Sequence, residues 1–385
     1  MIRTLHAENL KCFESLRLDL APLTLLTGFN AAGKSTSLQA LLLLAQTLRS
    51  QRGTVELRLN GPLAALGTPS DVLNSASGAK RLALGVSSDE VELSWQFTLD
   101  EENRRSLRVS HLDITRGEGA ERLDESRLDG LDPVIASEGV RSLLRALERT
   151  VFLGAARQVE TEVFPVPLDV TVRRGDVGVI GQFAAWWLYT EGDTQVSAAR
   201  RNSLNREAAT LRQQLNVWCD ELFPGAEINA VPVPRTNLMR LELRSGPTVD
   251  WSSPANIGYG VSYAFPILMA GLCATAAHPL ILDSPEAHLH PRGQSRIGRF
   301  LAQMAAADSQ ILVETHSDHL LNGVRLAVRD GLIRPEDVAI YFFAQNAAAH
   351  VTSLSVDKNG TINDWPEGFF DQSEKDLAKL AGWTA

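Results

Sequence analysis

A short segment near the start of the chain has residue types and a spacing suited to binding phosphate. Residues 28–36 read GFNAAGKST and fit the phosphate-loop pattern G-x-x-x-x-G-K-[ST] in full. Glycines let backbone N–H groups turn toward phosphate oxygens, and a helix that begins there adds partial positive charge. Lys34 would reach the β- and γ-phosphates, and Ser35 would hold Mg²⁺. The residues predicted to bind a nucleoside triphosphate are Gly28, Asn30, Ala31, Ala32, Gly33, Lys34, Ser35 and Thr36.

The segments on both sides of this loop have the character that the motif requires. Residues 23–27 form an apolar run typical of a buried strand, and residues 37–48 are rich in Leu, Ala and Gln, as helices are. A strand, a glycine-rich loop and a helix together are the context in which the pattern binds phosphate. A chance glycine turn before a core helix is the alternative, and the agreement between the loop and its flanks argues against it.

A carboxylate follows a second apolar strand. Residues 279–283 read PLILD, so the strand ends in Asp283, which would steer Mg²⁺ as well as take part in catalysis. Glu286 comes soon after, and a glutamate beside the γ-phosphate can polarise the attacking water. The alternative is the start of a helix decorated with acids, which is common.

A histidine follows a third apolar strand. Residues 310–314 read QILVE, and His316 lies just past them. A residue at that position faces the ligand crevice of an open α/β sheet, so His316 could bond the γ-phosphate. A lone histidine is more often structural, but its position after the strand favours the functional interpretation.

A second glycine-rich helix start predicts a contact between subunits. Residues 256–262 read NIGYGVS, and Gly258, Gly260 and Ser262 would form an anion site at a helix N-terminus. One phosphate tail rarely needs two such sites on the same polypeptide. We therefore expect this one to meet the nucleotide bound by another copy of the chain.

The elements that position these residues alternate in the last third of the chain. From Val261 the pattern predicts helix, strand, helix, strand, helix and strand, as in an open α/β sheet. The intervening residues are an insertion that is first β-rich and then helical. We expect strands at 2–9, 15–20, 23–27, 55–59, 91–99, 106–115, 151–153, 226–232 and 238–244, helices at 140–147, 176–190 and 197–222, and a mobile loop at 117–133.

This order predicts a nucleotide-binding unit that is split in sequence. Residues 1–54 and 251–385 would form its core, residues 55–135 a β-rich lobe, and residues 136–250 a helical insertion with short return strands.

Composition limits the classes of protein that fit. The net charge of −9 over 385 residues argues against a wholly basic DNA-coating protein, although a local basic groove remains open. The 3 cysteines lie far apart and the N-terminus lacks a signal-peptide core, which predicts a cytoplasmic protein. Residues 261–282 contain no charged side chain, but their Pro, Gly and Ser favour a buried helix and strand over a membrane span.

In their order, these motifs resemble the ABC-type ATPases of the SMC/RecF/OLD branch. The resemblance is carried by the phosphate loop, the long insertion, GYGVS at 258–262, LDSPEAHLHP at 282–291 and ETHSDHL at 314–320. ENLKCF at 8–13 is similar to their early strand motif. The segment GTINDWPEGFFD at 360–371 resembles the C-terminal signature of a bacterial ATPase subfamily of uncertain function.

The resemblance implies an α/β P-loop NTPase fold, an ABC-type ATPase head, that uses ATP and Mg²⁺. Gly258, Gly260 and Ser262 would touch the γ-phosphate of the partner subunit, and His316 would be a switch histidine. Arg157 and Gln158 could fill the Q-loop position. Ser284 stands where ABC transporters carry the catalytic glutamate. Relatives in this branch keep a glutamate after the proline, so Glu286 is the candidate base and a water held by Ser284 is the alternative.

The resemblance also implies a function. Two subunits would pair head to tail around two ATP molecules, and hydrolysis would loosen the pair. The output would be DNA binding or control of an effector in bacterial phage defence or DNA repair. OLD-type proteins carry a nuclease domain after the ATPase, and the residues after His316 lack a plausible cluster of metal-binding acids. We therefore expect any nuclease to be a separate protein.

Basic clusters are the candidate DNA contacts, and a solvated face is the alternative for each of them. The clusters are Arg104, Arg105 and Arg108, then Arg173 and Arg174, then Arg200, Arg201 and Arg206.

Two other functions fit parts of the sequence. A metal-dependent hydrolase or nuclease could use Asp283, Glu286, His288, His290, Glu314, His316, Asp318 and His319, since such groups hold Zn²⁺ or Mn²⁺. The ATPase subunit of a membrane transporter is less favoured because the insertion is long, so we expect no membrane partner.

Overall fold

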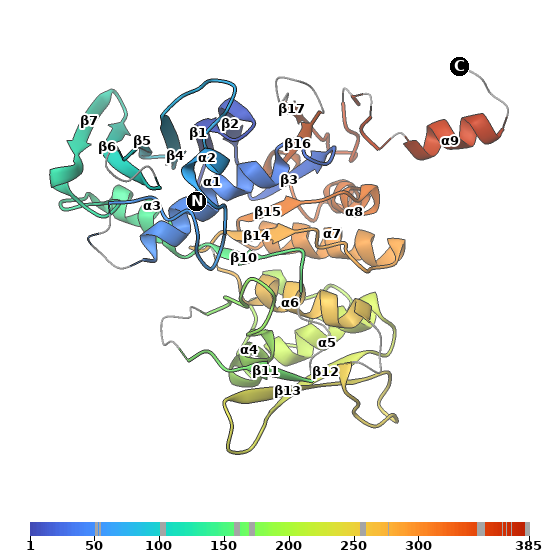
Figure 1. Cartoon of the computed structure of the whole chain (residues 1–385). Coiled ribbons are helices and arrows are strands. Elements are labelled where there is room, and N and C mark those ends of the chain that lie inside the picture. Colours follow the sequence, from blue (N-terminus) through green and yellow to red (C-terminus); the bar gives the residue numbers. More distant parts are fainter. Residues whose placement is uncertain are drawn as a thin grey trace.

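Two six-stranded sheets lie side by side in the described part of the chain (Figure 1). The computed structural model describes residues 1–50, 53, 55–100, 105–157, 162–168, 174–254, 259–275, 277–344, 351–363, 365–366, 368–370 and 372–381. A three-stranded sheet and a two-stranded ribbon complete the strands within these ranges.

The first sheet is antiparallel and joins the N-terminus to the β-rich stretch. Its strand order is β2-β1-β4-β5-β6-β7. Strand β5 shows why it forms, because its side chains alternate between buried and half-buried and place Trp95 and Phe97 in the core. The strands are β1 (Thr4–Leu10), β2 (Phe13–Asp19), β4 (Arg81–Ser87), β5 (Glu92–Leu99), β6 (Leu107–Arg116) and β7 (Gly119–Asp124).

The prediction of a mobile loop at 117–133 was wrong. Gly117 has φ 54°, which allows a tight turn after β6, and β7 then pairs along its length with β6. Leu123 is buried opposite Leu112, whereas Arg122 forms an exposed ion pair with Asp113 at 2.6 Å. The polar composition therefore belongs to an edge strand and a short ribbon, β8 (Leu128–Asp129) with β9 (Asp132–Pro133).

The second sheet carries the phosphate loop. Its order is β10-β14-β15-β3-β16-β17; the first five strands are parallel and β17 is antiparallel to β16. The strands are β10 (Val151–Leu153), β14 (Leu280–Asp283), β15 (Ile311–Glu314), β3 (Leu23–Gly28), β16 (Val338–Phe343) and β17 (Val351–Leu354). Parallel strands end at one edge, so the residues that follow β3, β14 and β15 meet there.

Both faces of this sheet are covered, which explains why its strands are apolar runs. On one face, Leu282 and Val313 pack with the helices α6 (Tyr259–Cys273), α7 (Pro291–Ala306) and α8 (Asp318–Arg329). On the other face, Ile281 and Leu312 pack with α1 (Lys34–Leu48) and the first sheet. The predicted alternation of helices and strands from Val261 is confirmed.

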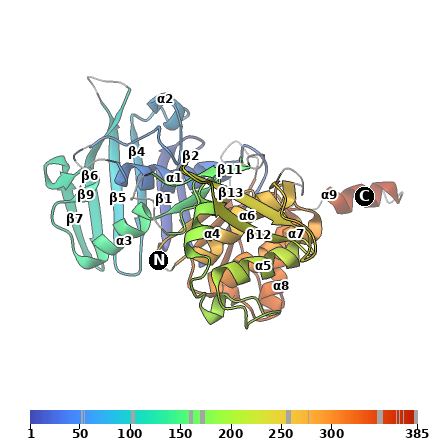
Figure 2. The same ribbon diagram turned by 90° about the horizontal axis from the view of Figure 1, so that it is seen from below.

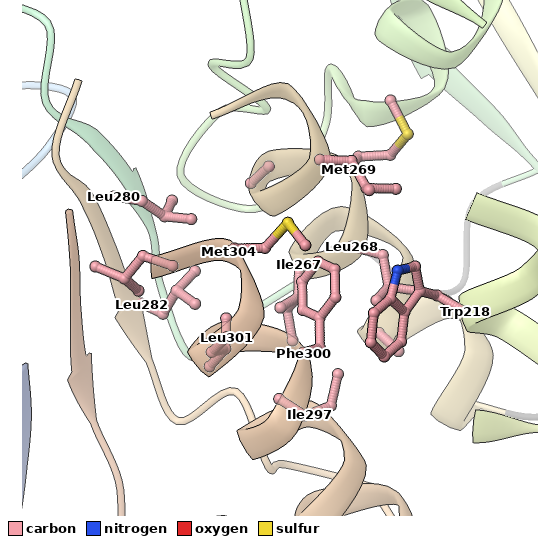
Figure 3. Close-up of a cluster of buried hydrophobic side chains, with 14 of the residues drawn as sticks. Trp218, Ile267, Leu268, Met269, Leu280, Leu282, Ile297, Phe300, Leu301 and Met304 are labelled. Atoms are coloured by element: carbon pink, nitrogen blue, oxygen red, sulfur yellow. The ribbon is translucent and has the colours of Figure 1, made fainter. Parts of the chain in front are cut away.

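The core on the helical side is drawn in Figure 3. Trp218 from α5 (Leu211–Leu222) meets Phe300 from α7 edge to face, with ring centroids 4.9 Å apart. Residues 261–282 are thus the buried helix α6 and strand β14 that the sequence predicted. Among the residues that the structure describes, no helix has both the length and the apolar character needed to cross a bilayer.

The insertion lies below the second sheet in Figure 1 and faces the viewer in Figure 2, which is seen from below. It contains α4 (Ala184–Glu191), α5 and the sheet β11-β13-β12, formed by β11 (Val163–Pro165), β12 (Glu227–Pro232) and β13 (Leu238–Arg244). The strands predicted at 226–232 and 238–244 are confirmed. Both predicted helices are too long, because Gly178 and Gly181 with φ 79° precede α4 and the Thr210–Gln213 capping box starts α5.

The remaining helices lie at the edges of the fold. They are α2 (Pro69–Val72), α3 (Glu138–Glu148) and α9 (Gln372–Leu380), with 3₁₀ turns at Glu125–Arg127, Ala198–Arg200 and Pro335–Asp337. Helix α9 extends away from the body of the molecule in both views (Figures 1 and 2). The division of the chain at residues 54, 135 and 250 stays a prediction. The first sheet takes strands from both sides of residue 54, since β1 pairs with β4.

Candidate nucleotide site

The phosphate loop joins β3 to α1 in a conformation that only small residues can adopt. Gly28 and Gly33 have φ values of 127° and 105°. A Cβ on Gly28 would lie 2.2 Å from the carbonyl oxygen of Phe343, and one on Gly33 would lie 2.4 Å from the ring of Phe13. Ala31, with φ 59°, also occupies the left-handed region. Close packing and the positive φ values therefore require glycine at both positions.

Lys34 folds back over this loop. Its side chain is only 3% exposed, and Nζ donates to the carbonyl oxygens of Gly28 at 3.2 Å and Phe29 at 2.7 Å. Burial lowers the pKa of Lys34, while the nearby carboxylates Glu314, Asp283 and Glu286 oppose that shift. The ammonium group thus sits where phosphate oxygens could replace the two carbonyl acceptors.

Two carboxylates lie side by side at the ends of β14 and β15. Asp283 and Glu314 are register partners, and Ser35 Oγ donates to Glu314 Oε1 at 2.8 Å. Burial, followed by the charge of Asp283, raises the pKa of Glu314 to about 7. The second oxygen of Glu314 is buried without a hydrogen-bond partner in the described structure.

Glu314 was predicted only as a member of the alternative metal cluster. Its position could have placed it at the ligand edge of the sheet, because it ends β15 as Asp283 ends β14, but not beside Ser35 in particular. The residues present fit Mg²⁺: one hydroxyl and two carboxylates are oxygen donors, and two adjacent acids with an unpaired oxygen favour a cation. Ser35, Asp283 and Glu314 are the residues that would hold it.

Glu286 and His316 come together from the loops after β14 and β15. Glu286 is 8% exposed, and its Oε1 accepts a hydrogen bond from the backbone N–H of His316 at 2.7 Å. Its other oxygen is buried without a partner among the described atoms. Burial raises the pKa of Glu286, and burial followed by the charge of Lys34 lowers the pKa of His316. The residues predicted to be catalytic, Asp283, Glu286 and His316, therefore lie together at the ends of β14 and β15.

Arg157 links this edge of the sheet to α6. Its Nη2 donates to the carbonyl oxygens of Asp283 at 2.7 Å and Ser284 at 3.1 Å. The guanidinium lies 5.6 Å from the centre of the Tyr263 ring, which in turn lies 4.2 Å from the His288 ring. Burial lowers the pKa of Arg157 to about 10. Gln158, its predicted companion, lies outside the described residues.

The second glycine-rich segment begins α6. Ser262 is 4% exposed, and its Oγ has no hydrogen-bond partner among the described residues. Gly260 packs closely, since a Cβ there would lie 2.9 Å from the ring of Phe223. Gly258 lies outside the described residues. The contact of this segment with a second subunit stays a prediction.

One described arginine of each basic cluster has partners within the chain. Arg200 is 8% exposed and donates to the carbonyls of Gly271 and Ala307 at 3.0 Å, so it is neither the candidate phosphate contact nor part of a solvated face. Arg174 pairs with Glu191 at 3.0 Å, and Arg108 pairs with Glu125 at 2.7 Å. Arg104 and Arg173 lie outside the described residues.

The alternative metal cluster lacks support from the geometry. In the ranges that the structure describes, no group of three or more His, Cys, Asp or Glu side chains is placed to hold a metal ion.

Two protein-family profiles match the chain. Residues 188–322 match "AAA domain, putative AbiEii toxin, Type IV TA system", and residues 333–380 match "Protein of unknown function (DUF3696)". The first match covers β14, β15 and His316, and the second covers β16, β17 and α9.

Comparisons with single proteins agree with the first match. The chain is 24% identical over 342 residues to an OLD nuclease from Thermus scotoductus, covering 82% of this chain and 59% of that protein. The fold is similar to an Smc head domain with an extended coiled coil bound to the C-terminal domain of ScpA, derived from Pyrococcus furiosus. That likeness has a TM-score of 0.52 at 13% identity and covers 99% of each chain.

The fold and the site together define a P-loop ATPase of mixed α/β class. The chain is related to the SMC/RecF/OLD-like ATPases, as its motifs predicted, and the likeness of its C-terminal segment to an ATPase subfamily stays a prediction.

Proposed function

We propose that the chain binds and hydrolyses ATP in the presence of Mg²⁺ and acts as a nucleotide-driven dimerisation switch. The main support for the proposal is that the Lys34 loop and two pairs of residues lie at the same edge of the second sheet. These pairs are Asp283 with Glu314, and Glu286 with His316. Positioning and charge neutralisation are what phosphoryl transfer requires of a protein.

Each residue has a role in this proposal. The loop N–H groups and Lys34 bind the phosphates, and a bound Mg²⁺ would neutralise charge on the β- and γ-phosphate oxygens. Glu286 accepts the proton of the water that attacks the γ-phosphorus, and the bond to the bridging oxygen of ADP breaks. Burial gives Glu286 a raised pKa, which makes it a stronger base than an exposed carboxylate. His316 hydrogen-bonds the phosphate that leaves.

Pairing of two subunits would complete the site. Ser262 of one copy would bond the γ-phosphate held by Lys34 of the other once the start of α6 moves to expose its Oγ, which is buried and has no hydrogen-bond partner among the described residues. A phosphate oxygen would supply the partner that a buried hydroxyl needs. Hydrolysis would remove this contact and loosen the pair.

The biological output is proposed from the relatives. The relationship to an OLD nuclease supports a role in bacterial phage defence or DNA repair, with DNA as a possible ligand. The chain spans 59% of the length of that protein. We propose that the switch controls an effector protein such as a nuclease.

ATP binding tests the proposal at Lys34. Replacing it with alanine removes charge-assisted contacts to two phosphates, each worth about 1.5–3 kcal/mol, so affinity for a fluorescent ATP analogue should fall by about 100-fold or more. Lys80→Ala is the matched control, because Lys80 is an exposed lysine just before β4. Wild-type affinity in Lys34→Ala would contradict the site assignment.

A further inference from the structure

The C-terminal segment touches the phosphate loop directly. Gly368, with φ 84°, lies against Phe29, the second residue of the loop, and a Cβ on Gly368 would lie 2.6 Å from Cζ of that ring. A side chain at this position would displace the Phe29 ring, and the positive φ also favours glycine, so the segment packs closely against that ring. The contact joins residues near opposite ends of the chain.

An aromatic cluster continues from this contact. The rings of Phe29 and Phe342 have centroids 5.8 Å apart, and those of Phe342 and Phe369 are 5.4 Å apart and nearly perpendicular. Phe369 is 1% exposed and also packs against Trp365 at 4.6 Å and Phe370 at 5.0 Å. We call these five residues the aromatic cluster. Edge-to-face pairs of this kind contribute beyond the area that they bury.

Strand β16 holds the loop on the same side. The backbone N–H of Phe29 donates to the carbonyl oxygen of Phe343 at 3.0 Å. The carbonyl of Phe29 accepts from Lys34 Nζ at 2.7 Å. Phe29 therefore connects the aromatic cluster to the lysine that faces the phosphates, through its own backbone.

The C-terminal segment has a second attachment, to helix α8. Arg325 of α8 donates from Nε to the carbonyl oxygen of Gly360 at 2.7 Å, and its guanidinium lies 5.6 Å from the centre of the Trp365 ring. Helix α8 begins at Asp318, directly after the loop that carries His316. The C-terminal segment therefore contacts the phosphate loop through Phe29 and helix α8 through Arg325.

We infer that the aromatic cluster holds the phosphate loop in its binding shape, and that Phe29 is a positioning residue for the bound nucleotide. The inference rests on the proposed ATP site. If the cluster stabilises the loop that ATP needs, ATP must in turn stabilise the cluster, because coupling between two sites is reciprocal. The C-terminal segment then becomes more ordered when nucleotide binds.

Phe29→Ala is the main test, because Phe29 is exposed and its loss leaves the buried Phe369 in place. Losing its ring contacts should weaken ATP and ADP alike by about two- to tenfold, since the loop binds phosphates that both share. Phe29→Leu keeps an apolar side chain next to Phe342 and adds no atom toward Gly368, so it should retain affinity better than Phe29→Ala. Tyr189→Ala is the control, because Tyr189 is an exposed aromatic on α4 that packs against Trp186 and not against the loop.

Hydrogen exchange distinguishes coupling from a purely structural role of Phe29, because only coupling makes exchange near Phe369 respond to nucleotide. In the full-length wild-type chain, Mg·ATP should slow exchange in peptides that contain the loop and in peptides that contain Phe369. In Phe29→Ala, the loop peptide should still respond while the Phe369 peptide no longer does. In Lys34→Ala, neither peptide should respond to nucleotide.

The outcomes separate the two proposals. If Mg·ATP leaves the loop peptide unchanged in the wild type, the ATP site itself is wrong. If the loop peptide slows and the Phe369 peptide does not, the ATP site stands and the coupling through Phe29 is wrong. Unchanged nucleotide affinity in Phe29→Ala would also overturn the inference.

Discussion

Ser35 Oγ donates a hydrogen bond to Glu314 Oε1 at 2.8 Å, which joins the first turn of α1 to the end of β15. The two residues are far apart in sequence, and the parallel pairing of β3 with β15 brings them together. Glu314 also lies beside Asp283, so the hydroxyl and both acids form one polar cluster next to Lys34. The free energy of unfolding should therefore depend on pH through this cluster.

Without nucleotide, Glu314 should destabilise the fold as pH rises. Its pKa is raised from 4.5 to about 7, so the folded state keeps a proton that the unfolded chain has lost. The free energy of unfolding contributed by Glu314 therefore falls between about pH 4.5 and pH 7, by up to about 3 kcal/mol. Glu314→Gln should gain stability relative to wild type when pH rises from 5 to 8, as measured by urea unfolding. A difference that does not change with pH would contradict this assignment, and Glu336→Gln, at an exposed site, is the control.

Glu286→Gln should keep ATP affinity within about threefold and slow hydrolysis. The amide cannot accept the proton of the attacking water, and general-base catalysis contributes about 10²–10⁴-fold to a rate. Phosphate release under saturating Mg·ATP measures the effect, with Glu336→Gln again as the control. Wild-type turnover would move the base elsewhere, and Ser284→Ala would then be the variant that loses activity.

Ser262→Ala should leave ATP binding to a single subunit intact and weaken pairing. It removes the hydroxyl that would bond the γ-phosphate of the partner subunit and adds no bulk at this buried position in the first turn of α6. Nucleotide titration and light scattering separate these two effects. A Ser262→Ala protein that pairs normally with ATP would remove Ser262 from the proposed interface. Circular dichroism checks that the variant is folded.

Arg200→Ala should cost stability. Arg200 is buried and donates to two backbone carbonyls and to Ser309 Oγ at 2.9 Å. Its removal leaves buried acceptors unpaired, which we expect to cost about 2–4 kcal/mol. Arg206, an exposed neighbour in sequence, supplies the matched variant Arg206→Ala, which should cost less than about 0.5 kcal/mol. Chemical denaturation measures both, and equal effects would contradict the buried role of Arg200.

Local sequence patterns predicted the phosphate loop and the residues that directly follow apolar strands. The strand β3, its loop and α1 follow one another, so a glycine spacing between an apolar run and a helix was sufficient. Asp283 and His316 were predicted for the same reason, since each lies at or just past the end of an apolar strand.

Contacts between distant residues were not predictable from those patterns. The pairing of Ser35 with Glu314 depends on strand order, which a single sequence does not reveal. Arg200 looked like part of a basic cluster, yet carbonyls from α6 and from the end of α7 enclose it. The contact of Gly368 with Phe29 likewise depends on where the tail folds back.

The mass of Glu286→Gln in solution is the most direct test of whether ATP drives two chains to pair. A site shared between two subunits requires the γ-phosphate, and a variant that binds ATP without cleaving it should hold the pair together. Sedimentation should show twice the mass of one chain with Mg·ATP, and one chain with Mg·ADP, without nucleotide, or when Lys34→Ala is added. The same mass under all four conditions would contradict a nucleotide-driven switch.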